Sequence, residues 1–347
     1  MKAVRLHDYD QRPEVEEVPE PQITDPFDVI VRIGGAGLCR TDLHIMQGMW
    51  QRDIGVDVLP LTLGHENAGW IHEVGEGVTH VQVGDPVICH PQMTCGVCIP
   101  CRSGDDMHCR DSKFPGLDTD GGFAELLKTN ARTVVKLPEE LEPKAVAAHA
   151  DAGLTAYHAV KKAARMLDPG THAVIIGAGG LGHIAIQCLK AMSAAEVTVV
   201  DVSEEALKLA EDWGADHTVL ADGNQVDSVM DITAGHGAEA VIDFVGEFGV
   251  IDYAKKMVRG HGSYFVVGYG DDLQIPAIQV IFNEISFVGC LVGTYVELVE
   301  LVTLARQGLV TLHTQDYPLE AANDAISELE SGELRGRGIF VPEGAAV

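Results

Sequence analysis

The chain has 347 residues, of which 46% are apolar and 22% charged, and 52 acidic against 24 basic residues give a formal net charge of −28. This length allows two domains, and so apolar a composition excludes disorder as the dominant state. The acidic charge would repel phosphate backbones, which argues against nucleic-acid binding, and no apolar stretch reaches the roughly 18 to 20 residues of a membrane span.

The acidic residues are spread along the whole chain rather than gathered in a tail. Salt screens the repulsion within such a surface, so we hypothesise a protein of a high-salt, halophilic cytosol, with an ordinary acidic protein as the alternative. The first ten residues, MKAVRLHDYD, contain no apolar h-region of a secretory signal. We therefore expect a cytoplasmic protein without membrane partners.

Up to about residue 150 the sequence consists of short β-like runs punctuated by glycine. Examples are residues 29–33, 70–74 and 86–89, and helical periodicity is scarce between them. This pattern predicts a barrel-like or irregular β domain.

Near residue 150 the pattern changes to alternating strands and helices. Residues 173–177 form a compact apolar run that is followed by an apolar helical face, and residues 197–201 predict the next strand. Ser203 with two glutamates after it predicts a helix start, and Gly214 its end. This alternation is typical of an α/β fold with a doubly wound parallel sheet, and the last 55 or so residues could return to the first domain. Further strands are predicted at residues 217–220, 240–245, 263–268 and 285–289.

A glycine motif follows the first of these strands, where residues 177–182 read GAGGLG. The form G-x-G-x-x-G between a strand and a helix is typical of a dinucleotide site, although a glycine turn can also serve packing alone. The three glycines allow a tight turn, close approach of a pyrophosphate and packing of the helix on the strand. An aspartate 19 residues further on ends the next strand, and its carboxylate favours NAD over NADP because it would repel a 2′-phosphate. The expected dinucleotide contacts are Gly177, Gly179, Gly180, Leu181, Gly182 and Asp201.

Four of the eight cysteines are clustered with the spacing C-x2-C-x2-C-x7-C. Thiolates so close in sequence suit a closed tetrahedral structural zinc site, and the absence of a secretion signal argues against disulfides. An iron–sulfur cluster and a nucleic-acid-binding zinc ribbon are the alternatives, and the net charge disfavours the ribbon. The expected zinc lobe spans about residues 90–112, with the ligands Cys95, Cys98, Cys101 and Cys109.

A second set of metal ligands is spread over two glycine-flanked turns. Cys39 begins the sequence CRTDLH, and His65 lies in the sequence GHE. A catalytic zinc needs three protein ligands and one open position, and cysteine and histidine are ligands that zinc prefers. Asp42 and Glu66 could orient these ligands or act as alternative ones.

With these motifs in this order, the sequence resembles the medium-chain zinc-dependent alcohol dehydrogenases, especially the bacterial and archaeal secondary-alcohol dehydrogenases. Residues 64–75 fit the zinc signature G-H-E-x-x-G-x5-G of that family, and the resemblance runs from residue 1 to about residue 342. It implies a barrel-like, GroES-like catalytic domain at residues 1–152 and 293–347, and a Rossmann domain that binds NAD at residues 153–292. It also implies a homotetramer and two zinc ions per chain, one catalytic and one structural.

The resemblance also assigns the catalytic metal ligands. Cys39 and His65 match the first two, and Asp151 falls at the third position, where many members have cysteine. His149 is a nearby rival for that ligand. Glu66 matches a residue that can approach the zinc, and an aspartate, Asp42, matches the partner that orients the histidine ligand.

Other positions match residues of the proton path and of the cofactor site. Thr41 matches the hydroxyl that binds the substrate alcohol, and His44 matches the outer end of a proton relay. Trp50 and Gln92 fall near substrate-pocket positions but could equally serve packing. Cofactor contacts are implied for Arg40, Arg337 with Arg335 as its competitor, Thr155, Val267, Gly268 and Tyr269.

The implied activity is hydride transfer between NAD and a primary or secondary alcohol, which gives an aldehyde or ketone. A polyol or sugar dehydrogenase of the same family is the alternative, because such sites often have an acidic third ligand. The alternative outside enzymes is a zinc-containing, NAD-binding sensor without turnover.

Overall fold

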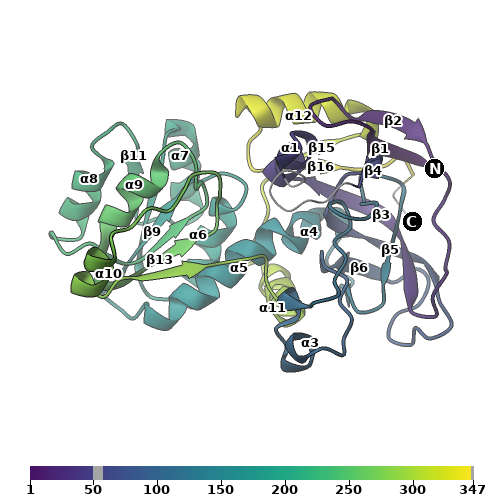
Figure 1. Cartoon of the computed structure of the whole chain (residues 1–347), viewed down its shortest axis with the longest axis horizontal. Coiled ribbons are helices and arrows are strands. Elements are labelled where there is room, and N and C mark those ends of the chain that lie inside the picture. Colours follow the sequence, from purple (N-terminus) through teal and green to yellow (C-terminus); the bar gives the residue numbers. More distant parts are fainter. Residues whose placement is uncertain (50–57, 345–347) are drawn as a thin grey trace. The chain divides into compact units, whose positions relative to one another are not determined.

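The computed structural model describes residues 1–49 and 58–344, which form two compact units (Figure 1). Unit 1 comprises Met1–Leu154, Thr294–Gly308 and Leu312–Val347. Unit 2 comprises Thr155–Gly293 together with Leu309–Thr311. No helix within the described ranges is both long and apolar enough to cross a membrane.

Unit 1 is built from two β-sheets. The small sheet is antiparallel, with the order β2 (Glu14–Glu17), β1 (Lys2–Leu6) and β4 (Leu61–Thr62). In the large sheet, one parallel pair at the edge continues into antiparallel strands. Its order is β15 (Thr314–Tyr317), β16 (Arg337–Phe340), β3 (Asp28–Leu38), β5 (Glu66–Val74), β6 (Pro86–Cys89) and β8 (Val134–Lys136), with β7 (Leu126–Asn130) also paired to β3.

The core of unit 1 is mainly aliphatic, as the low aromatic content of 5% requires. Strand β3 supplies a nearly continuous buried run, and other strands pair with it along both edges. Phe123 and Phe340 add a buried edge-to-face pair with ring centroids 4.5 Å apart. Strand β16, from the C-terminal part of the chain, is thereby tied to β3 by both hydrogen bonds and packing.

Short helices connect the strands of unit 1. They are α1 (Arg40–Met46), α3 (Ile99–Ser103), η1 (Asp106–His108), α4 (Pro143–Val146), η2 (Ala147–Ala150), α11 (Tyr295–Arg306), η5 (Leu319–Ala321) and α12 (Ala322–Ser331).

Unit 2 is a parallel six-stranded sheet with helices on both sides (Figure 1). The chain builds outward from β9 to β11, then crosses to the other side of β9 and continues to β14, so the sheet is doubly wound. The expected α/β architecture of a barrel-like β-rich part and a Rossmann sheet is confirmed. The strand order is β11 (His217–Leu220), β10 (Glu196–Asp201), β9 (His172–Ile176), β12 (Ala238–Asp243), β13 (Val258–Val266) and β14 (Ser286–Gly289).

The helices of unit 2 follow the predicted alternation. Ser203 caps α7 as predicted, since its hydroxyl accepts the amide hydrogen of Ala206 at 3.3 Å. The helices are α5 (Ala152–Ala163), most of which lies in this unit, η3 (Ala164–Met166), α6 (Gly182–Met192), α7 (Glu204–Asp212), α8 (Gln225–Ile232), α9 (Val250–Ala254), η4 (Lys255–Met257) and α10 (Ala277–Asn283).

Two predicted strands end earlier than expected, and the same residue explains both. The prediction at 240–245 overran β12 because the Asp243 carboxylate binds the amides of Val245 and Gly246, which turns the chain. The prediction at 263–268 overran β13 because the amides of Val267 and Gly268 both donate to the Asp243 carbonyl. Strand β13 also begins earlier, at Val258, than the apolar pattern indicated.

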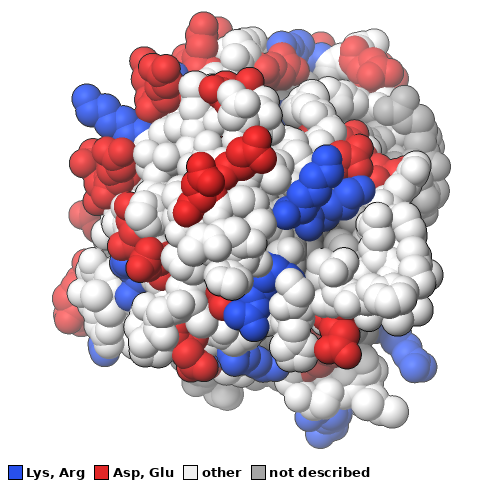
Figure 2. All heavy atoms as spheres, turned by 90° about the vertical axis from the view of Figure 1, so that its left-hand side faces the viewer, with Lys and Arg blue, Asp and Glu red and all other residues white. Residues whose placement is uncertain are grey.

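The acidic side chains occupy many separate places on the face drawn in Figure 2, with fewer basic side chains between them. This matches their even spread along the sequence.

Candidate active site

Four side chains that could bind a metal converge inside unit 1. The ligand atoms of Cys39, His65, Glu66 and Asp151 all lie within 4.8 Å of one another, and the cluster is buried. Cys39 lies between β3 and α1, and Asp151 lies between η2 and α5. His65 directly precedes β5, and Glu66 is the first residue of that strand. Of the two rivals for the third ligand, the cluster contains Asp151 and not His149.

Two glycines make room for this cluster. Gly64 has a φ of +99°, and a Cβ atom there would lie 2.3 Å from Cδ1 of Phe123. At Gly37 on β3, a Cβ atom would lie 2.0 Å from Oε2 of Glu66. Any larger side chain at either position would therefore push against the core or against the acidic side chain of the cluster.

His65 lies between two carboxylates. Its Nδ1 is 3.4 Å from Oδ1 of Asp42 and its Nε2 is 3.4 Å from Oδ2 of Asp151. Burial lowers the pKa of His65, but the charge of Asp42 and the contact with Asp151 outweigh it, so the pKa is raised well above its ordinary value. This buried site therefore attracts positive charge, whether a proton or a metal ion.

The buried polar atoms of the site fit a metal ion. Both ring nitrogens of His65 and one carboxylate oxygen of Asp151 have no hydrogen-bond partner within the described ranges. Unpaired buried polar atoms are costly unless a ligand satisfies them. A thiolate, an imidazole and a carboxylate are a donor set that zinc accepts, so Cys39, His65 and Asp151 suit a three-ligand catalytic site.

Asp42 connects helix α1 to this histidine. One carboxylate oxygen accepts the amide hydrogen of Cys39 at 2.9 Å and caps the helix, while the other faces His65. The resemblance implied that Asp42 orients the histidine ligand, and its carboxylate lies beside the His65 ring. On the same helix Arg40 is exposed, Thr41 is half-buried, and His44 is only 6% exposed.

Glu66 has a buried partner that the motifs did not indicate. Arg337 on β16 donates to its carboxylate from Nε at 2.9 Å and from Nη2, and the amide of Ala152 donates to Oε1 at 3.0 Å. Burial raises the pKa of Glu66, although Arg337 opposes this rise. Arg337 was expected to contact the pyrophosphate of the cofactor, but its Nε and Nη2 donate to Glu66. Arg335, the competing candidate, is partly exposed.

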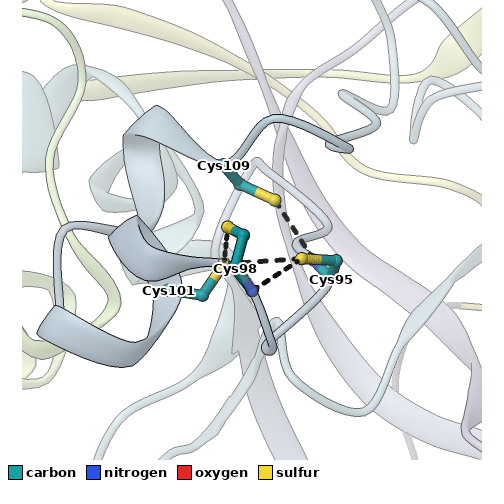
Figure 3. A group of neighbouring side chains, drawn as sticks. All are labelled: Cys95, Cys98, Cys101 and Cys109. Carbon is teal, nitrogen blue, oxygen red and sulfur yellow. Dashed lines mark hydrogen bonds between the residues drawn. The ribbon is translucent and has the colours of Figure 1, made fainter.

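The four clustered cysteines converge in the lobe around α3 and η1, with their sulfur atoms facing one another (Figure 3). Cys98 Sγ is 3.4 Å and Cys95 Sγ is 4.0 Å from Cys101 Sγ, too far for disulfides. A tetrahedron with 2.3 Å zinc–sulfur bonds places its sulfurs about 3.8 Å apart. The cluster with Cys109 therefore has the dimensions of a four-cysteine zinc site.

Backbone amides already favour thiolates in this lobe. The amide of Cys98 donates to Cys95 Sγ at 3.4 Å, and the amide of Cys95 donates to Cys109 Sγ at 3.3 Å. Hydrogen bonds from backbone amides lower the pKa of Cys98 to about 6, whereas burial raises the pKa of Cys101 to about 12. A metal ion would hold all four as thiolates.

In unit 2, the glycine motif forms the turn between β9 and α6. Gly177 has a φ of +91°, and a Cβ atom at Gly182 would lie 1.8 Å from the Gly177 carbonyl oxygen. Gly179 is exposed and a Cβ atom there would meet nothing within 4 Å, so space remains for a ligand next to this backbone. The Asp201 carboxylate accepts the Ala178 amide hydrogen at 2.7 Å and thus lies beside the same turn.

The other expected cofactor residues also belong to unit 2. Thr155 is buried in α5, and Val267 and Gly268 follow β13 with Tyr269 exposed after them. The remaining substrate-pocket candidates are Gln92 and Trp50. Gln92 is buried in unit 1, and its Oε1 has no hydrogen-bond partner among the described residues, whereas Trp50 lies outside them.

Sequence reasoning also missed the buried pair of Asp243 with Tyr264. The signal was a single aspartate that ends the apolar run AVI of residues 240–242.

Comparison with known proteins identifies the class. Residues 25–139 match the alcohol dehydrogenase GroES-like domain, and residues 180–307 match the zinc-binding dehydrogenase domain. The NAD-dependent alcohol dehydrogenase of Sulfurisphaera tokodaii is 38% identical over 99% of this chain and 100% of its own length. The chain therefore belongs to the family of medium-chain zinc-dependent alcohol dehydrogenases.

Solved structures agree with this assignment. The crystal structure of the alcohol dehydrogenase from Aeropyrum pernix has a TM-score of 0.96 and 51% identity, and the match covers 99% of this chain and 100% of that one. The D-arabinose dehydrogenase from Sulfolobus solfataricus has a TM-score of 0.84 and 31% identity, with 98% and 99% covered.

Proposed function

We propose that the protein is an NAD-dependent alcohol dehydrogenase that oxidises a primary or secondary alcohol to an aldehyde or ketone and reduces NAD⁺ to NADH with release of one proton. The observation that carries this proposal is the buried convergence of Cys39, His65 and Asp151 in a chain of this family. The NAD dependence of the Sulfurisphaera relative and the position of Asp201 beside the glycine turn support the choice of cofactor.

Cys39, His65 and Asp151 would hold the catalytic zinc, and the four lobe cysteines the structural one. When bound, the catalytic zinc supplies a Lewis acid that lowers the pKa of an alcohol hydroxyl and polarises a carbonyl group in the reverse direction. Asp42 fixes the orientation of the His65 ring from the opposite side. Arg337 holds the carboxylate of Glu66 in a fixed place beside this ligand set.

In this proposal the chain's own hydroxyl and imidazole groups move the proton. The Thr41 hydroxyl, at the start of α1, accepts the proton of the substrate alcohol, and His44 on the same helix passes it toward solvent. Residues of unit 2 hold the dinucleotide: the glycine turn binds its phosphates, and Thr155 with residues 267–269 braces the nicotinamide.

A sugar or polyol dehydrogenase is the second candidate. Its support is the carboxylate of Asp151 at the third ligand position together with the likeness to a D-arabinose dehydrogenase.

Assembly as a homotetramer and a location in a high-salt cytoplasm belong to the same proposal. The exposed apolar side chains of α10 (Ile278, Ile281 and Phe282) support assembly, since such patches usually mark contact surfaces. The net charge of −28 supports the high-salt location.

A substrate panel tests the proposal. Purified protein is given NAD⁺ or NADP⁺ with 2-propanol, a primary alcohol, sorbitol or D-arabinose, and NADH or NADPH formation is followed by absorbance. Faster turnover of simple alcohols with NAD⁺ supports the main proposal, and faster turnover of sorbitol or D-arabinose favours the second candidate. A folded, zinc-loaded protein that oxidises none of them contradicts both.

A further inference from the structure

The strand order of the sheet in unit 2 predicts which loops bind each half of a dinucleotide. The strand order reverses between β9 and β12, and ligands of such sheets bind outside the carboxyl ends of the strands at this point. The turns after β9 and β10 would bind the adenosine half, and Asp201 is the last residue of β10. The nicotinamide side therefore falls to the turns after β12 and β13, which are residues 244–246 and 267–269.

Asp243 is the residue that joins these two turns. Its Oδ1 accepts the amide hydrogens of Val245 at 2.8 Å and of Gly246 at 3.0 Å. Its own carbonyl oxygen accepts those of Val267 at 3.0 Å and Gly268 at 2.8 Å. One fully buried aspartate thus fixes four amides, two in each turn.

The two turns are in backbone contact, so neither has room to shift alone. A Cβ atom at Gly268 would lie 2.4 Å from the carbonyl carbon of Val245, and one at Gly246 would lie 2.2 Å from the carbonyl oxygen of Gly268. The same Val245 touches the glycine turn, because a Cβ atom at Gly177 would lie 2.8 Å from its Cγ2. The two turns therefore keep one fixed arrangement relative to each other.

Tyr264 holds the Asp243 side chain in this orientation. Its hydroxyl donates to Oδ2 at 2.5 Å from the neighbouring strand β13, and both side chains are 0% exposed. The carboxylate accepts three hydrogen bonds in all, from two amides and one phenol. A carboxylate only accepts hydrogen bonds, so it satisfies three donors at once, which an amide or hydroxyl at this position could not do equally well.

We propose that Asp243 and Tyr264 form a positioning pair that sets the two turns receiving the nicotinamide half of the dinucleotide. This inference rests on the proposed function, since it assumes that the chain binds NAD. The pair does not touch the reacting atoms; it acts through the amides and backbone of residues 244–246 and 267–269.

Tyr264→Phe tests the pair because it removes one hydroxyl and keeps the ring in the core. We expect the Kd for NADH to rise about tenfold, as for loss of one charge-assisted hydrogen bond that orders a binding loop. The Kd for ADP-ribose, which lacks nicotinamide, should stay within about twofold of the wild-type value. Asp243→Asn keeps one oxygen for the two amides but replaces the oxygen that accepts from Tyr264 with an NH2 group, so its Kd for NADH should also rise.

Tyr317→Phe is the matched control. Tyr317 is buried in unit 1 and donates to Oε2 of Glu328 at 2.5 Å, so its loss lowers stability without touching the two turns. The Tm of both phenylalanine variants should fall, but the Kd for NADH should rise only for Tyr264→Phe. Equal changes in the Kd for NADH and ADP-ribose, or no change in either, would overturn the proposal.

These outcomes can be separated from failure of the proposed function. If the wild-type protein binds NADH and oxidises alcohols while Tyr264→Phe behaves like the control, only the positioning role is wrong. If the wild-type protein binds no NADH, the proposed function fails and the positioning role fails with it.

Discussion

The buried pair of Glu66 and Arg337 allows a quantitative test, because removal of one partner leaves a charge that water cannot reach. Arg337→Gln removes the guanidinium from a carboxylate that is 0% exposed and whose remaining described donor is the Ala152 amide. Loss of one partner of a buried ion pair costs about 3–5 kcal/mol. At roughly 2–4 °C per kcal/mol for a unit of this size, the Tm should fall by about 10 °C.

The pH dependence of this loss follows from the direction of the pKa shift. Burial already raises the pKa of Glu66 and Arg337 opposes the rise, so the variant raises it further. A carboxyl group whose folded pKa exceeds its unfolded value of about 4.3 destabilises the fold as pH rises between the two values. The variant should therefore be closest to wild type near the unfolded pKa of about 4.3 and should lose stability relative to wild type as pH rises above it.

The assay is urea unfolding of four proteins: the wild type, Arg337→Gln, a double variant and a control variant. The double variant Glu66→Gln/Arg337→Gln lacks both charges of this pair and should regain more than about 1 kcal/mol of the loss. Arg12→Gln, which breaks an exposed pair with Glu330, is the matched control and should change the free energy of unfolding by less than about 1 kcal/mol. The reasoning is refuted if Arg337→Gln resembles Arg12→Gln, or if the double variant is no more stable than the single one.

Three further predictions concern the metal sites and the glycine turn. Asp42→Asn should weaken catalytic-site zinc binding about 10- to 100-fold in a chelator competition, since it alters the group that orients the histidine ligand; unchanged competition would contradict this role. Gly179→Ala should raise the Kd for NADH at an unchanged Tm, whereas Gly182→Ala should lower the Tm; the prediction fails if both variants give the same pattern. In metal-free protein, alkylation of Cys98 should follow a pKa of about 6 while Cys101 stays unreactive near neutral pH, and equal rates for the two would contradict the lobe geometry.

Local motifs made part of this site predictable. The lobe cysteines and the glycine turn lie close together in sequence, so their spacing alone indicates their geometry. All six strands of the sheet in unit 2 were also predicted, since apolar runs bounded by glycine are a local signal, whereas only β3, β5 and β6 were predicted in unit 1. The convergence of Asp151 with Cys39 was implied only by resemblance to the family, because the two residues are far apart in the chain.

Partnerships across the fold were not predictable in this way. Arg337 lies 271 residues after Glu66, and only the antiparallel pairing of the strands around β3 brings the two together. Tyr264 contacts Asp243 because their strands are neighbours in the sheet, and nothing in the local pattern indicates that register. The ends of β12 and β13 were misplaced because hydrogen bonds to Asp243 end these strands, and not a change in hydrophobicity. After β12 the amides donate to its side chain, and after β13 they donate to its carbonyl oxygen.

The most direct test of the account measures zinc and activity on the same sample. Purified protein should contain two zinc ions per chain, and a chelator that removes one of them should abolish alcohol-dependent NADH formation without unfolding the protein. One equivalent of zinc should then restore the activity in the wild type, but far less in Asp151→Ala, which lacks the proposed third ligand. Full NADH formation in protein freed of zinc, or full restoration in Asp151→Ala, would contradict the account.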